Sequence, residues 1–227
     1  MISRRKLFVG AAVLPVASGL VMTESEARRM AMKRSSNGKR SFTAPLSGRE
    51  SLRRRYFPNI DLVTSDGEKV KFYDDLIKDK IVVLNMMYAD CNGICPTLTS
   101  NLKSVRKILR NEINHDIFIY SITVNPEHDT PAAMKAYAKM HGVSDPQWLF
   151  LTGHPDDLDE LRHKLGFADP NPDVDRDKSR HSGMLRYGNE PLSIWGTCQG
   201  SAEPDWIAQE IGFAVPRDFK RHPRVNE

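Results

Sequence analysis

Two cysteines separated by three residues are the clearest chemical feature of this sequence. Cys91 and Cys95 enclose Asn-Gly-Ile and are followed directly by Pro96. Thiols at this spacing are close enough to form a disulfide or to bind one metal ion together. A disulfide around so small a loop stabilises little through chain entropy. The pair therefore indicates a redox or metal site more strongly than a structural bridge.

A metal site built on two thiolates needs at least one more ligand. A thiolate pair with an added imidazole suits copper, which binds as Cu(I) through sulfur and as Cu(II) when nitrogen is added. Zinc would require a fourth ligand or a water molecule. Among the seven histidines, His181 stands out because it ends a polar loop, residues 169–180, and precedes an expected strand. Thiol–disulfide exchange without a metal is the alternative chemistry.

The elements that must position these side chains alternate between strand and helix patterns. Apolar runs predict buried central strands at 81–88 and 117–124 and a short strand at 148–151. Helical spacing predicts helices from 96 to 109, from 129–131 through 140, from 154 through 165, and from 202 to 211. Hairpins are expected over 60–72 and over 183–195, the second with its turn at Gly188-Asn189, and residues 169–180 are expected to form a mobile loop.

This order predicts an α/β sandwich with a mixed central sheet, flanking helices and an N-terminal hairpin. The cysteine pair lies between the strand 81–88 and the following helix. Open α/β sheets place their functional sites at the C-terminal ends of central strands. Cys95 also falls at a helix start, where backbone N–H groups and the helix dipole favour a thiolate. The predicted fold therefore supports a functional dithiol.

Composition indicates a soluble globular protein. Hydrophobic residues make up 40% of the 227 residues, charged residues 27%, and the mean hydropathy is −0.48. These values exclude a polytopic membrane protein and wholesale disorder. Three cysteines are too few for a disulfide framework. The net charge of +4 arises from the N-terminal region, since residues 28–55 hold ten basic side chains and one acidic one. A nucleic-acid partner is therefore not indicated.

The first residues have the features of an export signal. Arg4 and Arg5 precede an uncharged stretch, residues 7–22, and residues 25–27 follow the small-x-small pattern of a cleavage site. The paired arginines resemble a twin-arginine signal. The stretch contains Pro15 and is short for a membrane-spanning helix. We expect export to the periplasmic side of the bacterial inner membrane, with the leader either cleaved or kept as an anchor.

Four segments follow from these patterns. They are a twin-arginine-type signal segment, 1–27, a basic disordered linker, 28–55, a folded domain, 56–212, and a C-terminal tail, 213–227. The linker mixes basic residues with Ser, Gly and Pro and has no apolar period, which is typical of a solvated chain. Contact with anionic lipid headgroups is the alternative role for its charge.

Three motifs together resemble the Sco/SenC family. The segment around Cys91 and Cys95 resembles its Cys-x-x-x-Cys-Pro motif, and residues 123–131 are similar to its Asp-Pro-x-x-Asp-Thr-Pro stretch. His181-Ser182 matches its His-Ser/Thr after a variable loop, and the matches, in family order, cover roughly residues 56–211. The resemblance implies a thioredoxin-like fold, a membrane-facing location, and copper binding by Cys91, Cys95 and His181.

The resemblance also implies a role in assembling the dinuclear copper centre of cytochrome c oxidase. The protein would deliver copper to the copper-bearing subunit, reduce the thiols of that subunit, or do both, and a copper donor or a thiol reductant would be a further partner. Asp129 matches a family position near the site, where its carboxylate would orient a ligand or accept a hydrogen bond. The local sequence equally allows Asp129 to cap a helix. Asn92 and Asn125 depart from the family, in which many members carry proline and aspartate.

Other sulfur-containing residues have weaker claims to the site. Cys198 is an odd thiol, and we predict that it is buried without a role, with a resolving thiol or a covalent dimer as alternatives. Met86 and Met87 lie on an expected core strand, so packing explains them. Met184, three residues after His181, is a further candidate ligand.

Overall fold

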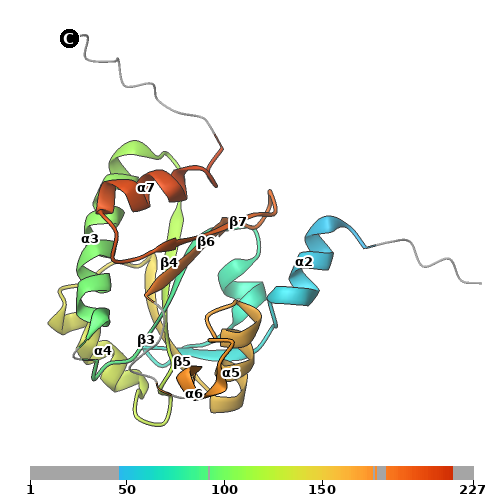
Figure 1. Ribbon diagram of the computed structural model, residues 1–227. Coiled ribbons are helices and arrows are strands. Elements are labelled where there is room, and N and C mark those ends of the chain that lie inside the picture. The colour runs from blue at the N-terminus through green and yellow to red at the C-terminus, as the bar shows by residue number, and fades with distance from the viewer. Residues whose placement is uncertain (1–45, 92, 176, 178–182, 217–227) are drawn as a thin grey trace, which may run out of the picture. The chain divides into compact units, whose positions relative to one another are not determined.

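The computed structural model describes residues 46–91, 93–175, 177 and 183–216. A seven-stranded mixed sheet has the order β2-β1-β5-β4-β3-β6-β7, with helices on both faces (Figure 1). The strands are β1 Asp61–Thr64, β2 Lys69–Lys71, β3 Ile81–Met87, β4 Ile117–Thr123, β5 Trp148–Gly153, β6 Met184–Asn189 and β7 Ile194–Gln199. The helices are α2 Gly48–Tyr56, η1 Phe72–Ile77, α3 Ile94–Glu112, α4 Pro131–Met140, α5 Pro155–Lys164, α6 Pro172–Asp175 and α7 Pro204–Gly212.

The centre of the sheet is the strand that leads to the cysteine pair. Every residue of β3 is buried, and β3 pairs with β4 in parallel and with β6 in antiparallel orientation. Strands in this position are covered on both faces, which explains their continuous apolar sequence. The two central strands predicted from the sequence are therefore confirmed.

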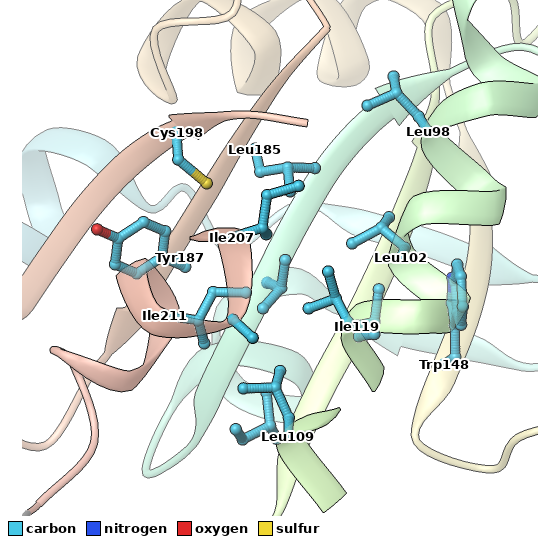
Figure 2. Close-up of a cluster of buried hydrophobic side chains, with 14 of the residues drawn as sticks. Leu98, Leu102, Leu109, Ile119, Trp148, Leu185, Tyr187, Cys198, Ile207 and Ile211 are labelled. Carbon is cyan, nitrogen blue, oxygen red and sulfur yellow. The ribbon is translucent and has the colours of Figure 1, made fainter. Parts of the chain in front are cut away.

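The two faces of the sheet belong to two separate apolar clusters. Residues of β3 alternate between them, with Val83 in the first cluster and Leu84 in the second. Helices α3, α4 and α7 cover the first cluster, which includes the labelled side chains of Figure 2. Helices η1 and α5 cover the second cluster, which contains Phe72 and Leu161. This arrangement anchors β3 from both sides.

Helix α3 begins directly at the cysteine pair. Its N-cap is Gly93, and Pro96 lies in the first turn, where a missing N–H costs no helical hydrogen bond. The buried stripe contains Leu98, Leu102, Val105 and Leu109, as the helical spacing predicted. The helix starts two residues earlier and ends three residues later than expected, so Cys95 is part of the helix.

The N-terminal hairpin is confirmed, whereas the turn of the C-terminal hairpin was predicted in the wrong place. β1 and β2 pair in antiparallel orientation around the predicted turn. In the second hairpin, Gly188 lies within β6 opposite Trp195, and the turn occupies residues 190–193. A Cβ on Gly188 would come within 2.2 Å of the Trp195 ring, so glycine is needed there for packing. Ser193 adopts the turn's positive φ of 56°.

The folded region starts before residue 56, contrary to the predicted disordered linker. Ser47 caps α2 by accepting a hydrogen bond from the backbone N–H of Glu50. Arg49 pairs through two nitrogens with the buried carboxylate of Glu190, at 2.7 and 2.5 Å, and also contacts Asp79. Local composition suggested disorder because the acidic partners of Arg49 lie far away in the sequence.

Two further boundaries differ from expectation. Ala214 and Val215 are buried in the first cluster, so the packed region extends past 212 into the predicted tail. The polar loop contains α6, and Asp175 accepts hydrogen bonds from Arg162 and from the backbone N–H of Asp169. The Arg162 guanidinium lowers the pKa of Asp175 to about 2. Residues 169–175 are therefore fixed by an ion pair instead of forming the expected mobile loop.

The predicted leader, 1–27, and most of the predicted linker lie outside the described residues. Within the described ranges, none of the helices combines the length and the apolar character needed to cross a bilayer.

Candidate metal and thiol site

The cysteine pair lies where β3 ends and α3 begins. The exposed fractions of Cys91 and Cys95 are 6% and 1%, and both side chains belong to the first apolar cluster. Both cysteines are free thiols in the structure. The predicted position at the C-terminal end of a central strand is confirmed.

The pKa values of the two thiols are shifted in opposite directions. Burial disfavours the Cys91 thiolate, but hydrogen bonds outweigh it and lower the pKa of Cys91 below 9.0. The donors are the Cys95 thiol, the backbone N–H groups of Cys95 and Gly93, and the Tyr88 hydroxyl. For Cys95, burial raises the pKa well above 9.0, and the neighbouring Cys91 raises it further. Of the two, Cys91 more readily forms the thiolate, and Cys95 more readily keeps its proton.

Two tyrosine hydroxyls stay protonated beside this dithiol. Burial and the contact with Cys91 raise the pKa of Tyr88 to about 12. Burial also raises the pKa of Tyr137 to about 12, and negative charge on either cysteine raises it further. The Tyr137 hydroxyl lies 2.9 Å from Thr99 Oγ1, one turn of α3 after Cys95. The sequence analysis did not select these tyrosines, although Tyr88 lies only three residues before Cys91.

Asp129 fixes the loop that carries Cys91. Its carboxylate is 2% exposed and accepts the backbone N–H of Ala89, at 3.1 and 3.2 Å from the two oxygens. It also accepts the hydroxyl of Thr123, at the end of β4. The alternative role of Asp129 as a helix cap is wrong, because Thr130 caps α4 by accepting from the backbone N–H of Ala133. Asp129 thus joins two strand ends beneath the dithiol loop.

Gly183, the residue just before β6, packs against the residue that precedes Cys95. Gly183 is buried, and a Cβ at this position would lie 2.4 Å from Cδ1 of Ile94, the residue before Cys95. Gly200 donates its N–H to the Gly183 carbonyl at 2.8 Å. Gly183 therefore allows β6 to approach the residue between the two cysteines. A glycine two residues after a candidate ligand was a signal that the sequence analysis did not use.

His181, the predicted third ligand, and Asn92 lie outside the described residues. In the part of the chain that the structure describes, no group of three or more His, Cys, Asp or Glu side chains could hold a metal ion.

The other sulfur atoms belong to the packing. Met86 is 2% exposed and Met87 is 1% exposed, and each packs in an apolar cluster, as predicted. Met184 packs against the second cluster, on the opposite face of the sheet from the cysteine pair. Cys198 is 3% exposed and lies beside Leu185, Tyr187 and Ile207 (Figure 2), so its predicted burial is confirmed.

A mixed sheet covered by helices on both faces, with a dithiol at a strand-to-helix junction, is a thioredoxin-like arrangement. Similar solved structures include BsSco, a member of the Sco family of cytochrome c oxidase assembly proteins, with 24% identity and a TM-score of 0.56. That likeness covers 68% of this chain and 90% of BsSco. A second is ScoI of Arabidopsis thaliana with copper bound, with 19% identity and a TM-score of 0.55, covering 67% of this chain and 92% of ScoI. These likenesses confirm the predicted fold.

The SCO1/SenC family model matches residues 49–212, and the chain belongs to this family. A relative in sequence is the SCO1 protein homolog of Bacillus subtilis, with 33% identity over 89 residues. The match covers 39% of this chain and 45% of the Bacillus protein, so the chain spans about half the length of that relative. The resemblance deduced from the three motifs is confirmed.

Proposed function

We propose that this protein binds copper through Cys91, Cys95 and His181 and delivers it to the dinuclear copper site of cytochrome c oxidase. The observation that carries the proposal is the buried pair of free thiols at the start of α3, with Gly183 packed against the residue that precedes Cys95. A thiolate pair with one imidazole is a donor set suited to copper. Membership of the SCO1/SenC family supports the same role.

The sequence distance between His181 and Gly183 supports the choice of third ligand. Two residues span at most ~7 Å, and His181 lies two residues before Gly183. Gly183 in turn packs against Ile94, between the cysteines in sequence. This short sequence distance from a residue beside Ile94 supports His181 as the third ligand.

The acidities of the two thiols bear on how copper would enter and leave. Cys91 offers a thiolate readily, whereas Cys95 must lose its proton when the metal binds. A site with three protein ligands leaves room for an incoming thiolate of the recipient subunit. Ligand exchange would then proceed as the recipient's sulfur binds and Cys95 is reprotonated. The high pKa of Cys95 thus favours release.

Metal-independent thiol–disulfide exchange is the second candidate, and the unequal pair Cys91 and Cys95 favours it. The Cys91 thiolate would attack a substrate disulfide, form a mixed disulfide and release one substrate thiolate. Cys95, after losing its proton, would attack the Cys91 sulfur and release the second substrate thiolate. The substrate gains two electrons, and the protein is left as a disulfide that an external dithiol must reduce.

Copper titration of the reduced full chain separates these functions. We expect one tightly bound copper per chain, lost in Cys91→Ser, Cys95→Ser and His181→Ala. Cys198→Ser and His154→Ala are matched controls and should bind copper like the wild type. Cys198 is not one of the proposed ligands, and His154 is the exposed N-cap residue of α5. Unchanged binding in His181→Ala would remove that residue from the site. Reduction of a disulfide peptide that needs no copper and no His181 would favour the second function.

The cellular location is part of the proposal. The paired Arg4 and Arg5 before an uncharged stretch support export by the twin-arginine route to the periplasmic side of the inner membrane. Replacing both arginines with lysine should keep the protein in the cytoplasm, as measured by cell fractionation. Export that is unaffected by this change would contradict the assignment of the signal.

A further inference from the structure

The two edges of the sheet differ in how well they are protected against pairing with another strand. β2 forms one edge, has three residues and carries Lys69 and Lys71. Short edge strands with lysines resist association with other strands. β7 forms the other edge, has six residues, and contains neither a charged residue nor proline (Figure 1). β7 therefore lacks the features that usually keep an edge unpaired.

The outward backbone groups of β7 follow from its register with β6. Gly200 donates to Gly183, so alternate residues of β7 face β6, and Trp195, Thr197 and Gln199 direct their backbone groups away from it. Within the described ranges, the N–H groups of these three residues donate to no backbone or side-chain acceptor. Thr197 and Gln199 are exposed. The edge therefore presents a row of open donors and acceptors.

We propose that β7 is a homodimer interface, in which two copies of this chain pair their β7 strands in antiparallel orientation about a two-fold axis at Thr197. Thr197 would face Thr197 of the second copy, and Trp195 would face Gln199 in both directions. Each of these pairs would exchange both of its backbone hydrogen bonds. Threonine opposite threonine is a favourable cross-strand pair, and the absence of charge on β7 removes like-charge repulsion.

The residues that flank the paired segment, Ile194 and Gly200, are compatible with the same two-fold axis. The register places Ile194 of one copy opposite Gly200 of the other. Ile194 is a large apolar side chain that is 42% exposed. Gly200 has no side chain, and Leu98 of the first cluster lies directly beneath it, within 2.2 Å of the position that a Cβ would take. Pairing would therefore place the exposed Ile194 beside a position that has no side chain to oppose it.

This dimer would leave the dithiol sites open. A two-fold axis perpendicular to the sheet reverses the strand direction of the second copy, so the ends of the two β3 strands that lead to Cys91 point in opposite directions. The interface does not depend on copper, and copper binding does not depend on the interface. A failure of one proposal is therefore distinguishable from a failure of the other.

Sedimentation of the full chain with one proline and one valine variant tests the interface. Thr197→Pro removes the outward N–H, a change that edge strands tolerate because β6 does not use that group. We expect a dimer for the wild type and for Thr197→Val, and an association weakened at least about tenfold for Thr197→Pro, because the central hydrogen bonds are lost. Copper stoichiometry should stay at one per chain in every form.

Hydrogen exchange of the wild type provides a readout that needs no variant. The amides of Trp195, Thr197 and Gln199 should become protected as the protein concentration rises. A wild type that stays monomeric up to its solubility limit would overturn the proposal. A dimer that persists unchanged in folded Thr197→Pro, or outward amides whose exchange is independent of concentration, would also overturn it.

Discussion

The cysteine pair and Cys198 occupy the same apolar cluster, yet their chemistry differs. The exposed fractions of Cys91, Cys95 and Cys198 are 6%, 1% and 3%. Cys91 lies at a helix start, where backbone N–H groups and a tyrosine hydroxyl lower its pKa. Cys198 lies inside β7, where burial and then Glu210 raise its pKa to about 12. Burial alone therefore does not decide whether a thiol reacts; the surrounding donors do.

The contrast also bears on the proposed function. A metal or a substrate thiol at the dithiol would meet hydrogen-bond donors that are already in place and a neighbouring proton on Cys95. Cys198 packs in the same cluster as Leu185 and Ile207 and interacts with the negative charge of Glu210. The surroundings of Cys91 stabilise a charged thiolate, whereas those of Cys198 favour a neutral side chain that fills the packed core.

Chemical modification gives the largest expected difference between the two regions. In the reduced, folded protein, iodoacetamide should modify Cys91 on the order of 100-fold faster than Cys198, because the thiolate is the reactive form. Peptide mass spectrometry would measure both rates. Copper should protect Cys91 and leave the slow rate of Cys198 unchanged.

Denatured protein is the control for that experiment, since the two rates should converge once the donors and the burial are lost. Equal rates in the folded state would show that the environment at the start of α3 does not activate Cys91.

Asp129→Ala tests the support beneath the dithiol. The variant leaves the N–H of Ala89 and the hydroxyl of Thr123 without their acceptor. We expect the free energy of unfolding to fall by about 2–3 kcal/mol, as for other unsatisfied buried groups. Copper affinity should fall by about 10- to 100-fold, as when a residue supporting a ligand is removed. Denaturation and copper titration would measure the two effects.

Thr130→Ala is the matched control for Asp129. Loss of this helix cap should lower the free energy of unfolding by about 1 kcal/mol and leave copper affinity unchanged. If both variants lowered copper affinity equally, Asp129 would act through general stability and not through the loop that it holds.

Gly183→Ala tests whether β6 is fitted to the dithiol loop. The added Cβ would lie 2.4 Å from Ile94 Cδ1, so we expect a loss of about 1–2 kcal/mol in stability and weaker copper binding. Ile94→Val removes that Cδ1 atom, so the double variant should recover much of both losses. A double variant no better than Gly183→Ala would show that the contact does not couple the two segments.

Alkaline titration gives the smallest expected effect when it is limited to the first half pH unit above 9. The pKa of Cys198 rises on folding from 9.0 to about 12, so the unfolded chain releases this proton first and stability falls between these pH values. The contribution is at most ~1.4 kcal/mol per pH unit. Cys198→Val removes this contribution. The unfolding free energy of the wild type minus that of the variant should therefore decrease as pH rises above 9. A constant difference would contradict the raised pKa.

Much of the fold could be predicted because its signals are local. The runs 81–88 and 117–124 are apolar on both faces, and such runs identify buried parallel strands without knowledge of their neighbours. The stripe of α3 and the turn of the first hairpin are also properties of short segments. The cysteine pair could be placed because it falls between two such signals.

The parts that could not be predicted depend on partners far away in the sequence. Helix α2 looked like disordered linker because Arg49 is stabilised by Glu190, 141 residues away. Asp129 looked like a helix cap because its real partner, Ala89, lies 40 residues earlier. The turn at 190–193 was missed because Gly188 serves the packing of Trp195. In each case a tertiary contact overrode the local pattern.

The grip of Arg49 on Glu190 and Asp79 decides where the polypeptide enters the folded body. Asp79 precedes β3 by two residues, whereas Cys91 follows its far end, and the seven residues of β3 span ~20 Å. Helix α2 is thus held near the start of β3, whereas the cysteine pair follows the far end of that strand. The contact that holds α2 therefore lies at the opposite end of β3 from the cysteine pair and does not obstruct the approach of a partner to the thiols.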